Sequence, residues 1–419
     1  MHQHIRFNAV VTAIGCALLL AGCGGGGDDA PLSPQLPPPI ADQPPPTPVQ
    51  PPPVATSLEV LTTTERRMES VAYFGGSAYL SLSNSKTEGT AVLKAALPLT
   101  RSSTWSPVNL GDCALGRQGD FMVRAPKLKM IGDDMWLMQP WSDLPEAKDE
   151  HWNCTLIAST GTFVRRDQGL RVCTGNVCET LAIEDIKQHG RRLYSNAGGG
   201  ANLFTSDDGG NTWTLVRGYN GKAFCDPSKF HVIGERVLMG GECPLDMAYL
   251  EAYQLTADGS ALASQATQAL NVPYLENRNV QFIESVPGTK RVFIGVEGGL
   301  LRSDDNGVSF DFVIHEPLGD SKYYPYIRYF LPLKGKPDTI VIGGFDKNTQ
   351  QAYLAWSKDG GTTWTDISKL IPDHGTVLED GGVHAISSLS EDPQGRILVT
   401  MGELEGVKGK LMLLTLGTD

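Results

Sequence analysis

The chain has 419 residues, of which 41% are hydrophobic, and its formal net charge at pH 7 is -12. A chain of this length can bury a substantial core, and its acidic balance excludes general nucleic-acid binding, which requires an excess of lysine and arginine to displace counterions from phosphates. Small molecules, sugars and other proteins remain as partners.

The N-terminus has the pattern of an export signal. Arg6 precedes an apolar run, residues 10–20, that is too short to cross a bilayer as a permanent helix. The tetrapeptide Leu-Ala-Gly-Cys that ends at Cys23 resembles the lipobox of bacterial lipoproteins, whose cysteine receives lipid chains such as palmitate. Gly24 stands where a retention signal has aspartate, so the resemblance implies an envelope protein anchored in the outer membrane, either periplasmic or surface-exposed. An ordinary cleavage site with an incidental cysteine is the alternative.

Proline dominates the segment from Pro31 to Pro53. Prolines lack amide donors and favour an extended polyproline II spacer, which rises about 3.1 Å per residue. We therefore divide the chain into a signal peptide (1–22), a disordered lipidated linker (23–54) and a folded domain (55–419). The proline segment could instead be a docking ligand for a proline-binding domain.

Cysteine usage agrees with export. Six cysteines remain beyond Cys16 and Cys23, and an even number favours disulfides in an oxidising compartment. One pair is symmetric about a Gly-Asn hairpin signal and another about Gly234. The predicted pairs are Cys173–Cys178, Cys225–Cys243 and, by elimination, Cys113–Cys154. A metal site is the competing interpretation, but the sequence has neither a Cys-x-x-Cys pair nor a nearby histidine cluster to support it.

Apolar strands ending in small residues recur at blade-length intervals through the folded domain. They lie at residues 72–76, 135–138, 192–195, 237–241, 292–295, 340–344 and 397–400. These seven units predict an all-β, seven-bladed β-propeller, with six blades as the alternative. Because an unpaired edge strand exposes backbone groups, we expect residues 57–61 and 411–416 to pair and close the ring.

An octet recurs three times within these units. It reads SDDGGNTW at 206–213, SDDNGVSF at 303–310 and SKDGGTTW at 357–364. In such a turn the aspartate accepts hydrogen bonds from amides, the glycine supplies a positive φ, and the aromatic residue packs beneath the hairpin. The structural residues are Ser206, Asp208, Gly210, Thr212, Trp213, Ser303, Asp305, Gly307, Ser357, Asp359, Gly361, Thr363 and Trp364.

These octets resemble the Asp box, Ser-x-Asp-x-Gly-x-Thr-Trp, of the BNR repeats of sialidases and related propellers. The resemblance implies that the boxes lie on the blade periphery and are not catalytic. In a propeller the innermost strands line a central channel, and period-two alternation can turn their polar residues toward it. The candidate binding-face residues are Arg124, His231, Arg278, Tyr324, Arg328 and His384, with Gln281 among the channel-lining set. A water-filled tunnel that binds nothing is the alternative.

The sialidase resemblance also implies three arginines, a tyrosine nucleophile paired with a glutamate, and an aspartate acid. The segment 123–126, Val-Arg-Ala-Pro, keeps only Arg-x-Pro of the family's Phe-Arg-Ile-Pro and falls in the second predicted blade. By elimination, Tyr324 and Glu276 are the candidate catalytic pair and Asp143 the acid, with Arg124, Arg278 and Arg328 as the triad.

We therefore predict an outer-membrane lipoprotein whose propeller acts as a binding or scaffold module for a glycan, a peptide or another envelope protein. An exo-sialidase-like glycoside hydrolase is the alternative. The sequence lacks a phosphate loop, a zinc-protease motif and a nucleophile elbow, and we expect no cofactor and no metal. The predicted partners are the bacterial membrane, through the lipid anchor, and one glycan or protein ligand, but no nucleic acid.

Overall fold

The computed structural model describes most of the predicted folded domain. The described residues are 55–83, 91–114, 126–138, 152–174, 177–180, 183–197, 202–218, 226–243, 247–263, 268–269, 272, 275, 278–315, 325–376, 383–402 and 409–417. The predicted signal peptide, lipidation site and proline-rich linker lie outside them. Within these ranges, no helix has the length and apolar character needed to cross a membrane.

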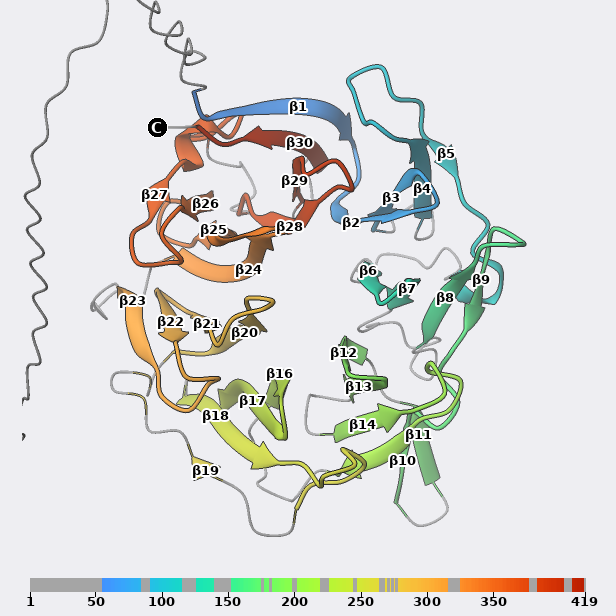
Figure 1. Ribbon diagram of the computed structural model, residues 1–419. Coiled ribbons are helices and arrows are strands. Elements are labelled where there is room, and N and C mark those ends of the chain that lie inside the picture. The colour runs from blue at the N-terminus through green and yellow to red at the C-terminus, as the bar shows by residue number, and fades with distance from the viewer. Residues whose placement is uncertain are drawn as a thin grey trace, which may run out of the picture. The chain divides into compact units, whose positions relative to one another are not determined.

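Seven four-stranded antiparallel sheets surround a central opening, so the predicted seven-bladed all-β propeller is confirmed (Figure 1). Blade 1 contains β2 (Met68–Phe74), β3 (Ser77–Leu82), β4 (Ala91–Ala96) and β5 (Ser106–Pro107), and blade 2 contains β6 (Lys127–Ile131), β7 (Asp134–Met138), β8 (Asn153–Ile157) and β9 (Thr162–Arg165). Blade 3 contains β12 (Ile183–His189), β13 (Arg192–Ala197), β14 (Asn202–Ser206) and β15 (Thr214–Arg217), and blade 4 contains β16 (Asp226–Ile233), β17 (Arg236–Cys243), β18 (Met247–Gln254) and β19 (Gln268–Ala269). Blade 5 contains β20 (Val280–Ser285), β21 (Val292–Val296), β22 (Gly299–Ser303) and β23 (Asp311–His315), and blade 6 contains β24 (Pro325–Leu333), β25 (Lys336–Asp346), β26 (Gln351–Ser357) and β27 (Thr365–Asp366). Blade 7 contains β28 (Ile386–Glu391), β29 (Ile397–Met401), β30 (Gly409–Thr415) and β1 (Ser57–Thr64).

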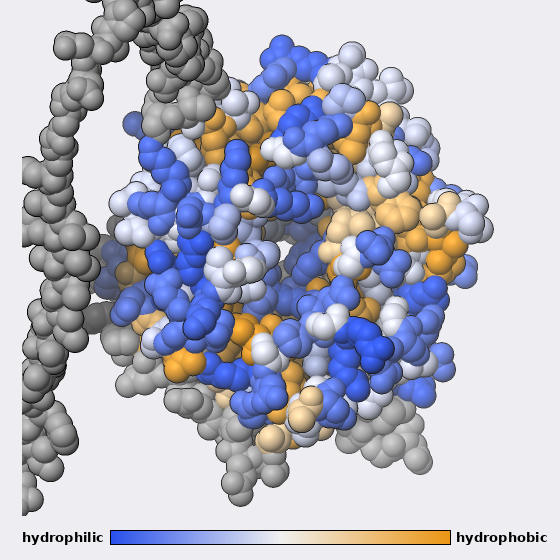
Figure 2. Space-filling model, in the orientation of Figure 1, coloured by the Kyte–Doolittle hydropathy of each residue, from blue (hydrophilic) through white to orange (hydrophobic). Residues whose placement is uncertain are grey.

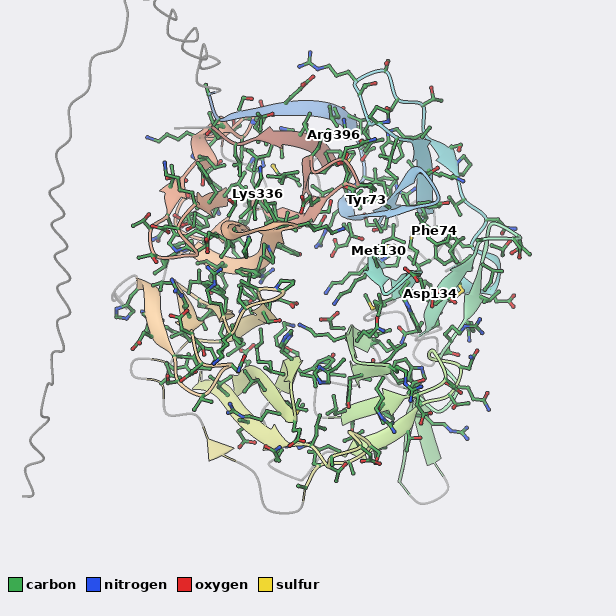
Figure 3. All side chains as sticks on the ribbon, in the orientation of Figure 1. Tyr73, Phe74, Met130, Asp134, Lys336 and Arg396 are labelled. Atoms are coloured by element: carbon green, nitrogen blue, oxygen red, sulfur yellow. A yellow bond between two sulfur atoms is a disulfide. The ribbon has the colours of Figure 1, made fainter. Side chains whose placement is uncertain are left out.

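The ring closes in blade 7, where the first described strand joins the last. β1 pairs antiparallel with β30, from Ser57 opposite Thr415 to Thr64 opposite Gly409. The predicted pairing of the two terminal strands is therefore confirmed. Side chains fill the wedges between neighbouring blades and leave the centre open (Figure 3). At the junction of blades 7 and 1, the hydroxyl groups of Tyr73 and Ser390 lie 2.8 Å apart.

The apolar run in the second strand of each blade is buried on both faces. Every residue of β21 and of β29 is buried. Small residues near the ends of these strands make room for the next blade: a Cβ added to Gly240 would lie 2.9 Å from Val280, and one added to Gly343 would lie 2.9 Å from Ile386. The predicted strand at 72–76 is an exception, because its glycines adopt positive φ and form the β2–β3 turn.

Each octet forms the turn between the third and the outermost strand of its blade. In the first, the amide of Thr212 donates to Asp208 Oδ1 at 2.9 Å and its hydroxyl donates to Oδ2 at 2.7 Å. Ser206 Oγ donates to the same carboxylate at 2.8 Å. The equivalent bonds centre on Asp305 and Asp359. The predicted turn hydrogen bonds are present, and they occupy all three carboxylates.

The glycine at the fifth position of each octet packs its blade against the preceding one. These glycines are Gly210, Gly307 and Gly361, with φ of 83°, 74° and 87°. A Cβ on Gly210 would overlap Cη2 of Trp136 in β7, while the other two would lie 2.8 Å from Leu238 and 2.7 Å from Phe293. The octets therefore link neighbouring blades as well as stabilising hairpins.

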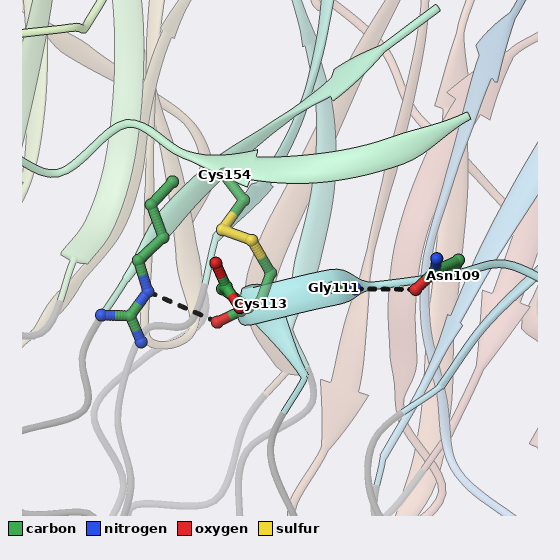
Figure 4. The surroundings of a disulfide bond; sticks show 6 residues. Asn109, Gly111, Cys113 and Cys154 are labelled. Carbon is green, nitrogen blue, oxygen red and sulfur yellow. Dashed lines mark hydrogen bonds between the residues drawn. A yellow bond between two sulfur atoms is a disulfide. The ribbon is translucent and has the colours of Figure 1, made fainter. Parts of the chain in front are cut away.

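A disulfide joins Cys113 to Cys154, as elimination predicted (Figure 4). Cys113 ends a 3₁₀ turn, η1 (Gly111–Cys113), in the connection from blade 1 to blade 2, and Cys154 lies on β8. Both cysteines are fully buried. The amide of Gly111 donates to Asn109 Oδ1 at 3.0 Å and helps to hold the turn. The bond therefore ties the inter-blade connection to the third strand of blade 2.

The other two predicted disulfides stay predictions. Cys173 and Cys178 lie directly opposite each other in the separate hairpin of β10 (Arg171–Thr174) and β11 (Val177–Thr180), which follows blade 2. Cys225 lies outside the described residues. Cys243, its predicted partner, ends β17.

Removing the described disulfide should lower the free energy of unfolding. We expect Cys113→Ala/Cys154→Ala to lose about 3 kcal/mol, because the unfolded chain is then released from a loop spanning a sequence separation of 41. Urea denaturation of the wild-type protein and of the double variant measures the difference in their free energies of unfolding. Cys173→Ala/Cys178→Ala is the control, since the predicted bond in that hairpin would close a much shorter loop. An unchanged free energy of unfolding in the first variant would contradict the expectation.

Candidate functional site

The innermost strands of all seven blades line one central cavity of about 270 Å³. These strands are β2, β6, β12, β16, β20, β24 and β28. In the space-filling view the channel opens as a hollow surrounded mostly by hydrophilic residues (Figure 2). Because its lining combines residues from all seven blades, we take this channel as the candidate site.

Bulges near the start of the inner strands turn extra side chains into the cavity. The register with the second strand skips Glu69 in β2, Gln281 in β20, Arg328 in β24 and Ser387 in β28. A bulge adds one residue to one strand of a pair and redirects its side chain. All four of these side chains line the cavity. The bulges therefore bring adjacent residues, such as Arg328 and Tyr329, to the same space.

Charged residues dominate the polar part of the lining. The described cations are Lys127, Lys129, Lys187, Lys229 and Arg328, and the described carboxylates are Glu69, Asp185 and Glu284. Five cations against three carboxylates give this lining a formal charge of +2, although the whole chain carries -12. The channel is thus electrostatically opposite to the molecule that surrounds it.

Lys187 lies at the centre of a buried ionic network. Its Nζ is 2.7 Å from Glu284 Oε1 and 3.7 Å from Asp185 Oδ2, and it donates to the carbonyl of Ile283 at 2.8 Å. Lys129 Nζ lies 2.6 Å from Asp185 Oδ1. Burial opposes the charge on Asp185, but the two lysines outweigh it and lower the pKa of Asp185 to about 2. The network joins blades 2, 3 and 5 across the channel.

His231 extends this network into blade 4. Its Nδ1 is 3.3 Å from Lys187 Nζ, and its Nε2 is 2.9 Å from Ser285 Oγ. An ammonium group can only donate, so we assign the imidazole proton to Nε2, which donates to Ser285. Burial, followed by the charge of Lys187, holds the pKa of His231 well below its usual value. His231 is therefore neutral at pH 7.

This tautomer of His231 decides whether the imidazole can act as a general base toward Ser285. Ser285, His231 and Glu284 are the residue types of a hydrolase triad, and Glu284 Oε2 is 3.7 Å from the Nδ1 atom of His231. A general base must accept the serine proton at Nε2, but here Nε2 carries a proton of its own. The arrangement therefore holds blades 4 and 5 together and does not activate the serine.

The depressed pKa of His231 makes stability depend on pH. Below about pH 6.5 the unfolded chain binds a proton on this histidine that the folded chain excludes, so the free energy of unfolding should fall by at most about 1.4 kcal/mol per pH unit. The charged groups near it are Lys187, Lys129, Asp185, Glu284 and His189. His231→Gln keeps a donor for Ser285 and should remove this part of the decline. Urea titrations at about pH 7.5 and about pH 5.5 test it, and an unaltered slope in the variant would refute the assignment.

The structure places the predicted binding-face residues in different environments. Arg328 lines the cavity and His231 adjoins it. Arg278 is fully buried, and its Nη1 donates to the carbonyls of Glu297 at 2.9 Å and Gly298 at 2.8 Å, so it supports the backbone and does not face a ligand.

His384 is also buried, and its amide donates to the carbonyl of Gln350 at 3.0 Å. Burial, with a smaller contribution from Lys410, lowers the pKa of this histidine. We therefore place His384, like Arg278, in the framework of the protein. Arg124, Tyr324, Glu276 and Asp143 lie outside the described residues, so the Tyr324–Glu276 pair stays a prediction.

Sequence reasoning missed most of the charged lining. Lys127 and Lys129 alternate on β6, and Asp185 and Lys187 alternate on β12, each pair directly upstream of an apolar second strand. Charges two residues apart on a strand share one face. That spacing, placed on an innermost strand, was the available signal for a charged channel.

No protein-family model and no curated protein sequence matches this chain. Solved structures do. YCF48 from Cyanidioschyzon merolae is similar with a TM-score of 0.50 and 12% identity, over 85% of this chain and 98% of that one. U3-55K has a TM-score of 0.52 and 11% identity, over 86% and 98%. The extracellular domain of a hybrid two-component system from B. thetaiotaomicron has a TM-score of 0.53 and 10% identity, over 85% of this chain and 42% of that one. At such identities the likeness shows the propeller fold alone.

Proposed function

We propose that this chain is an envelope-anchored propeller lipoprotein that binds a glycan, a peptide or another envelope protein at one mouth of its channel. The fold is that of a binding or scaffold module. The observation that carries the proposal is the ring of bulged side chains from several blades around one charged cavity. These converging side chains can make many polar contacts with a partner, and binding of this kind requires no catalytic reaction.

The described lining also supports binding over catalysis. Each of its carboxylates is already engaged by a cation: Glu69 by Arg67 at 2.7 Å, Asp185 by Lys129 and Glu284 by Lys187. Glycoside hydrolysis by paired carboxyl groups needs one of them free to donate a proton and the other free to attack or to activate water. The sialidase alternative therefore depends on Tyr324 and Glu276.

Replacing Tyr324 and Arg328 together by alanine tests the binding face. We expect the variant to lose retention on the cognate ligand, found by a glycan array run in parallel with cross-linking pulldown from envelope membranes, while its melting temperature stays nearly unchanged. Lys336→Ala is the matched control, because Lys336 is an exposed cation outside the cavity lining. Retention by the double variant would mean that the binding face lies elsewhere. Release of free sugar by the wild-type protein would favour the hydrolase.

The anchor rests on the lipobox-like tetrapeptide that ends at Cys23. We expect the wild-type chain to partition into the detergent phase of a Triton extraction and to incorporate a labelled fatty acid. Cys23→Ser should move it to the aqueous phase and abolish labelling. Cys16→Ser is the control, since this cysteine lies inside the predicted signal peptide. Equal partitioning of the Cys23 variant and the wild-type protein would refute lipidation at this position.

A further inference from the structure

We propose that the central cavity binds one neutral sugar ring, either a free monosaccharide or the terminal unit of a glycan. This inference rests on the proposed binding function and deepens it by naming the group that enters the channel. Three features of the cavity carry it: charges that compensate one another, hydrogen-bonding atoms that the protein leaves unused, and a volume that suits a single ring.

The charges of the lining already have partners within the protein. Each of the three carboxylates lies within 2.7 Å of a cation, in the pairs Glu69–Arg67, Asp185–Lys129 and Glu284–Lys187. Lys127 acts electrostatically on Asp185 and helps to lower the pKa of that carboxyl. Lys229 and Arg328 donate hydrogen bonds to protein acceptors. A charged ligand has to compete with these interactions, and a charge that loses its partner in an enclosed site is left uncompensated. A neutral ligand avoids this cost.

Two lysines retain hydrogen-bond donors that the protein does not use. An ammonium group carries three donors. Lys129 Nζ donates to Asp185 Oδ1 at 2.6 Å, and Lys127 Nζ donates to no residue that the structure describes. The two lysines alternate on β6, so they share one face of that strand, and both line the cavity. An oxygen atom of a ligand can therefore accept hydrogen bonds here while the Lys129–Asp185 pair stays intact.

Two carboxylates retain acceptors in the same cavity. Asp185 Oδ2 lies 3.7 Å from Lys187 Nζ, which is beyond hydrogen-bond distance. Glu284 Oε2 lies 3.7 Å from His231 Nδ1, which carries no proton in the tautomer that donates to Ser285. Water reaches both carboxylate side chains, because 24% of Asp185 and 34% of Glu284 is exposed. Each of these two oxygens can therefore accept a hydrogen bond from a ligand.

Hydroxyl groups match this arrangement of donors and acceptors. A hydroxyl donates one hydrogen bond and accepts others at the same atom, whereas an ionised carboxylate only accepts and an ammonium group only donates. Neighbouring hydroxyls on a sugar ring can accept from the lysines and donate to the carboxylates, and the ion pairs remain closed. A compound with many hydroxyls and no charge therefore uses the whole set, while an anion or a cation uses half of it.

Aromatic surface and a small volume favour a ring over a linear chain. Tyr329 and Phe330 both line the cavity and are half-buried, which provides apolar surface for the C–H face of a sugar. The Tyr329 hydroxyl makes no hydrogen bond to another described residue, so it adds one more polar contact. Pockets for drug-sized molecules measure about 300–1,000 Å³, whereas this cavity measures about 270 Å³. One ring fits, and the remainder of a longer glycan lies outside.

Isothermal titration of the full-length protein tests the inference with D-glucose, D-galactose and D-mannose, each beside its uronate and its 2-amino derivative. We expect at least one neutral hexose to bind, and both of its charged derivatives to bind about tenfold more weakly, or about 1.4 kcal/mol. Added salt should change the affinity of the neutral hexose little, because the ligand has no charge to screen. An unchanged affinity for the methyl glycoside indicates a terminal glycan unit, and its loss indicates a free monosaccharide.

Two variants test whether the hexose lies in the cavity. Lys127→Met removes donors and Tyr329→Phe removes one hydroxyl, so each should lower the affinity about fivefold, as expected for the loss of one hydrogen bond. Lys336→Met, which removes an exposed lysine outside the lining, should bind like the wild-type protein. Melting temperatures close to that of the wild-type protein exclude misfolding as the cause of a loss.

Three results would overturn the inference: no neutral hexose binds the wild-type protein, a charged derivative binds as tightly as its neutral parent, or both channel variants bind like the wild-type protein. If a glycan or protein ligand is retained while no neutral hexose binds, the proposed function stands and the sugar site fails. If a hexose binds in the cavity but no larger ligand is retained, the opposite holds.

Discussion

Replacing Gly210 by alanine should destabilise the propeller by about 2–6 kcal/mol. Two costs add. The glycine has φ of 83°, a conformation that costs other residues about 1–3 kcal/mol. A Cβ there would also overlap Cη2 of Trp136 in the preceding blade, and such overpacking typically costs about 1–3 kcal/mol. Urea unfolding of the variant and the wild-type protein measures the sum.

The neighbouring glycine separates the two costs. Gly209 also has a positive φ, of 71°, but nothing lies within 4 Å of a Cβ built on it. Gly209→Ala should therefore carry the backbone cost alone. In a Trp136→Phe background, which lacks the overlapping atom, Gly210→Ala should lose only about as much as Gly209→Ala. Equal effects of the two alanine variants in the wild-type background would show that the octet does not press against Trp136.

Lys187→Met should destabilise the protein by about 3 kcal/mol. Removing one partner of a buried ion pair leaves the other charge without compensation, which costs about 3–5 kcal/mol. We expect the lower end of this range, because about a third of the Glu284 side chain is exposed and water can solvate part of its charge. Lys129 continues to neutralise Asp185. Chemical denaturation at neutral pH gives the free energy difference.

A second substitution identifies the source of that loss. In Lys187→Met/Glu284→Gln the uncompensated carboxylate is gone, so the double variant should recover part of the stability lost by Lys187→Met. Lys129→Met is the control for removing a channel lysine, and it should cost less because about a third of the Lys129 side chain is exposed and Lys187 still faces Asp185. A double variant no more stable than Lys187→Met would show that packing, and not charge, explains the loss.

The architecture was predictable because its signals are local and repeated. The octets combine a turn aspartate, a positive-φ glycine and a buried aromatic residue such as Trp213. All three residues lie within one stretch of eight residues, so the sequence alone reveals them. The second strands read as apolar runs because neighbouring blades bury both of their faces. Ring closure followed from the rule that edge strands must be paired, which placed residues 57–61 against 411–416.

The channel was less predictable because a bulge leaves no pattern in the sequence. Strict alternation turns every second residue of an inner strand inward, but the extra residue at Glu69 or Ser387 breaks that count. Arg278 presents a related difficulty, since a cation that binds backbone carbonyls in the interior looks the same in sequence as one that faces a ligand. The pairing of Lys187 with Glu284 joins blades 3 and 5, and no local spacing reports a contact between them.

The β1–β30 ladder sets the order in which this domain can fold. Ser57 pairs with Thr415, so the first described strand to be synthesised has its partner in the last described one. Blade 7 cannot be completed until nearly the whole domain has been synthesised. Before that point β1 lacks its partner strand and exposes an unpaired edge. A circular permutant that joins residue 417 to residue 55 and opens the chain at the Gly75–Gly76 turn would make β1 and β30 consecutive, so this blade could assemble without waiting for the other six.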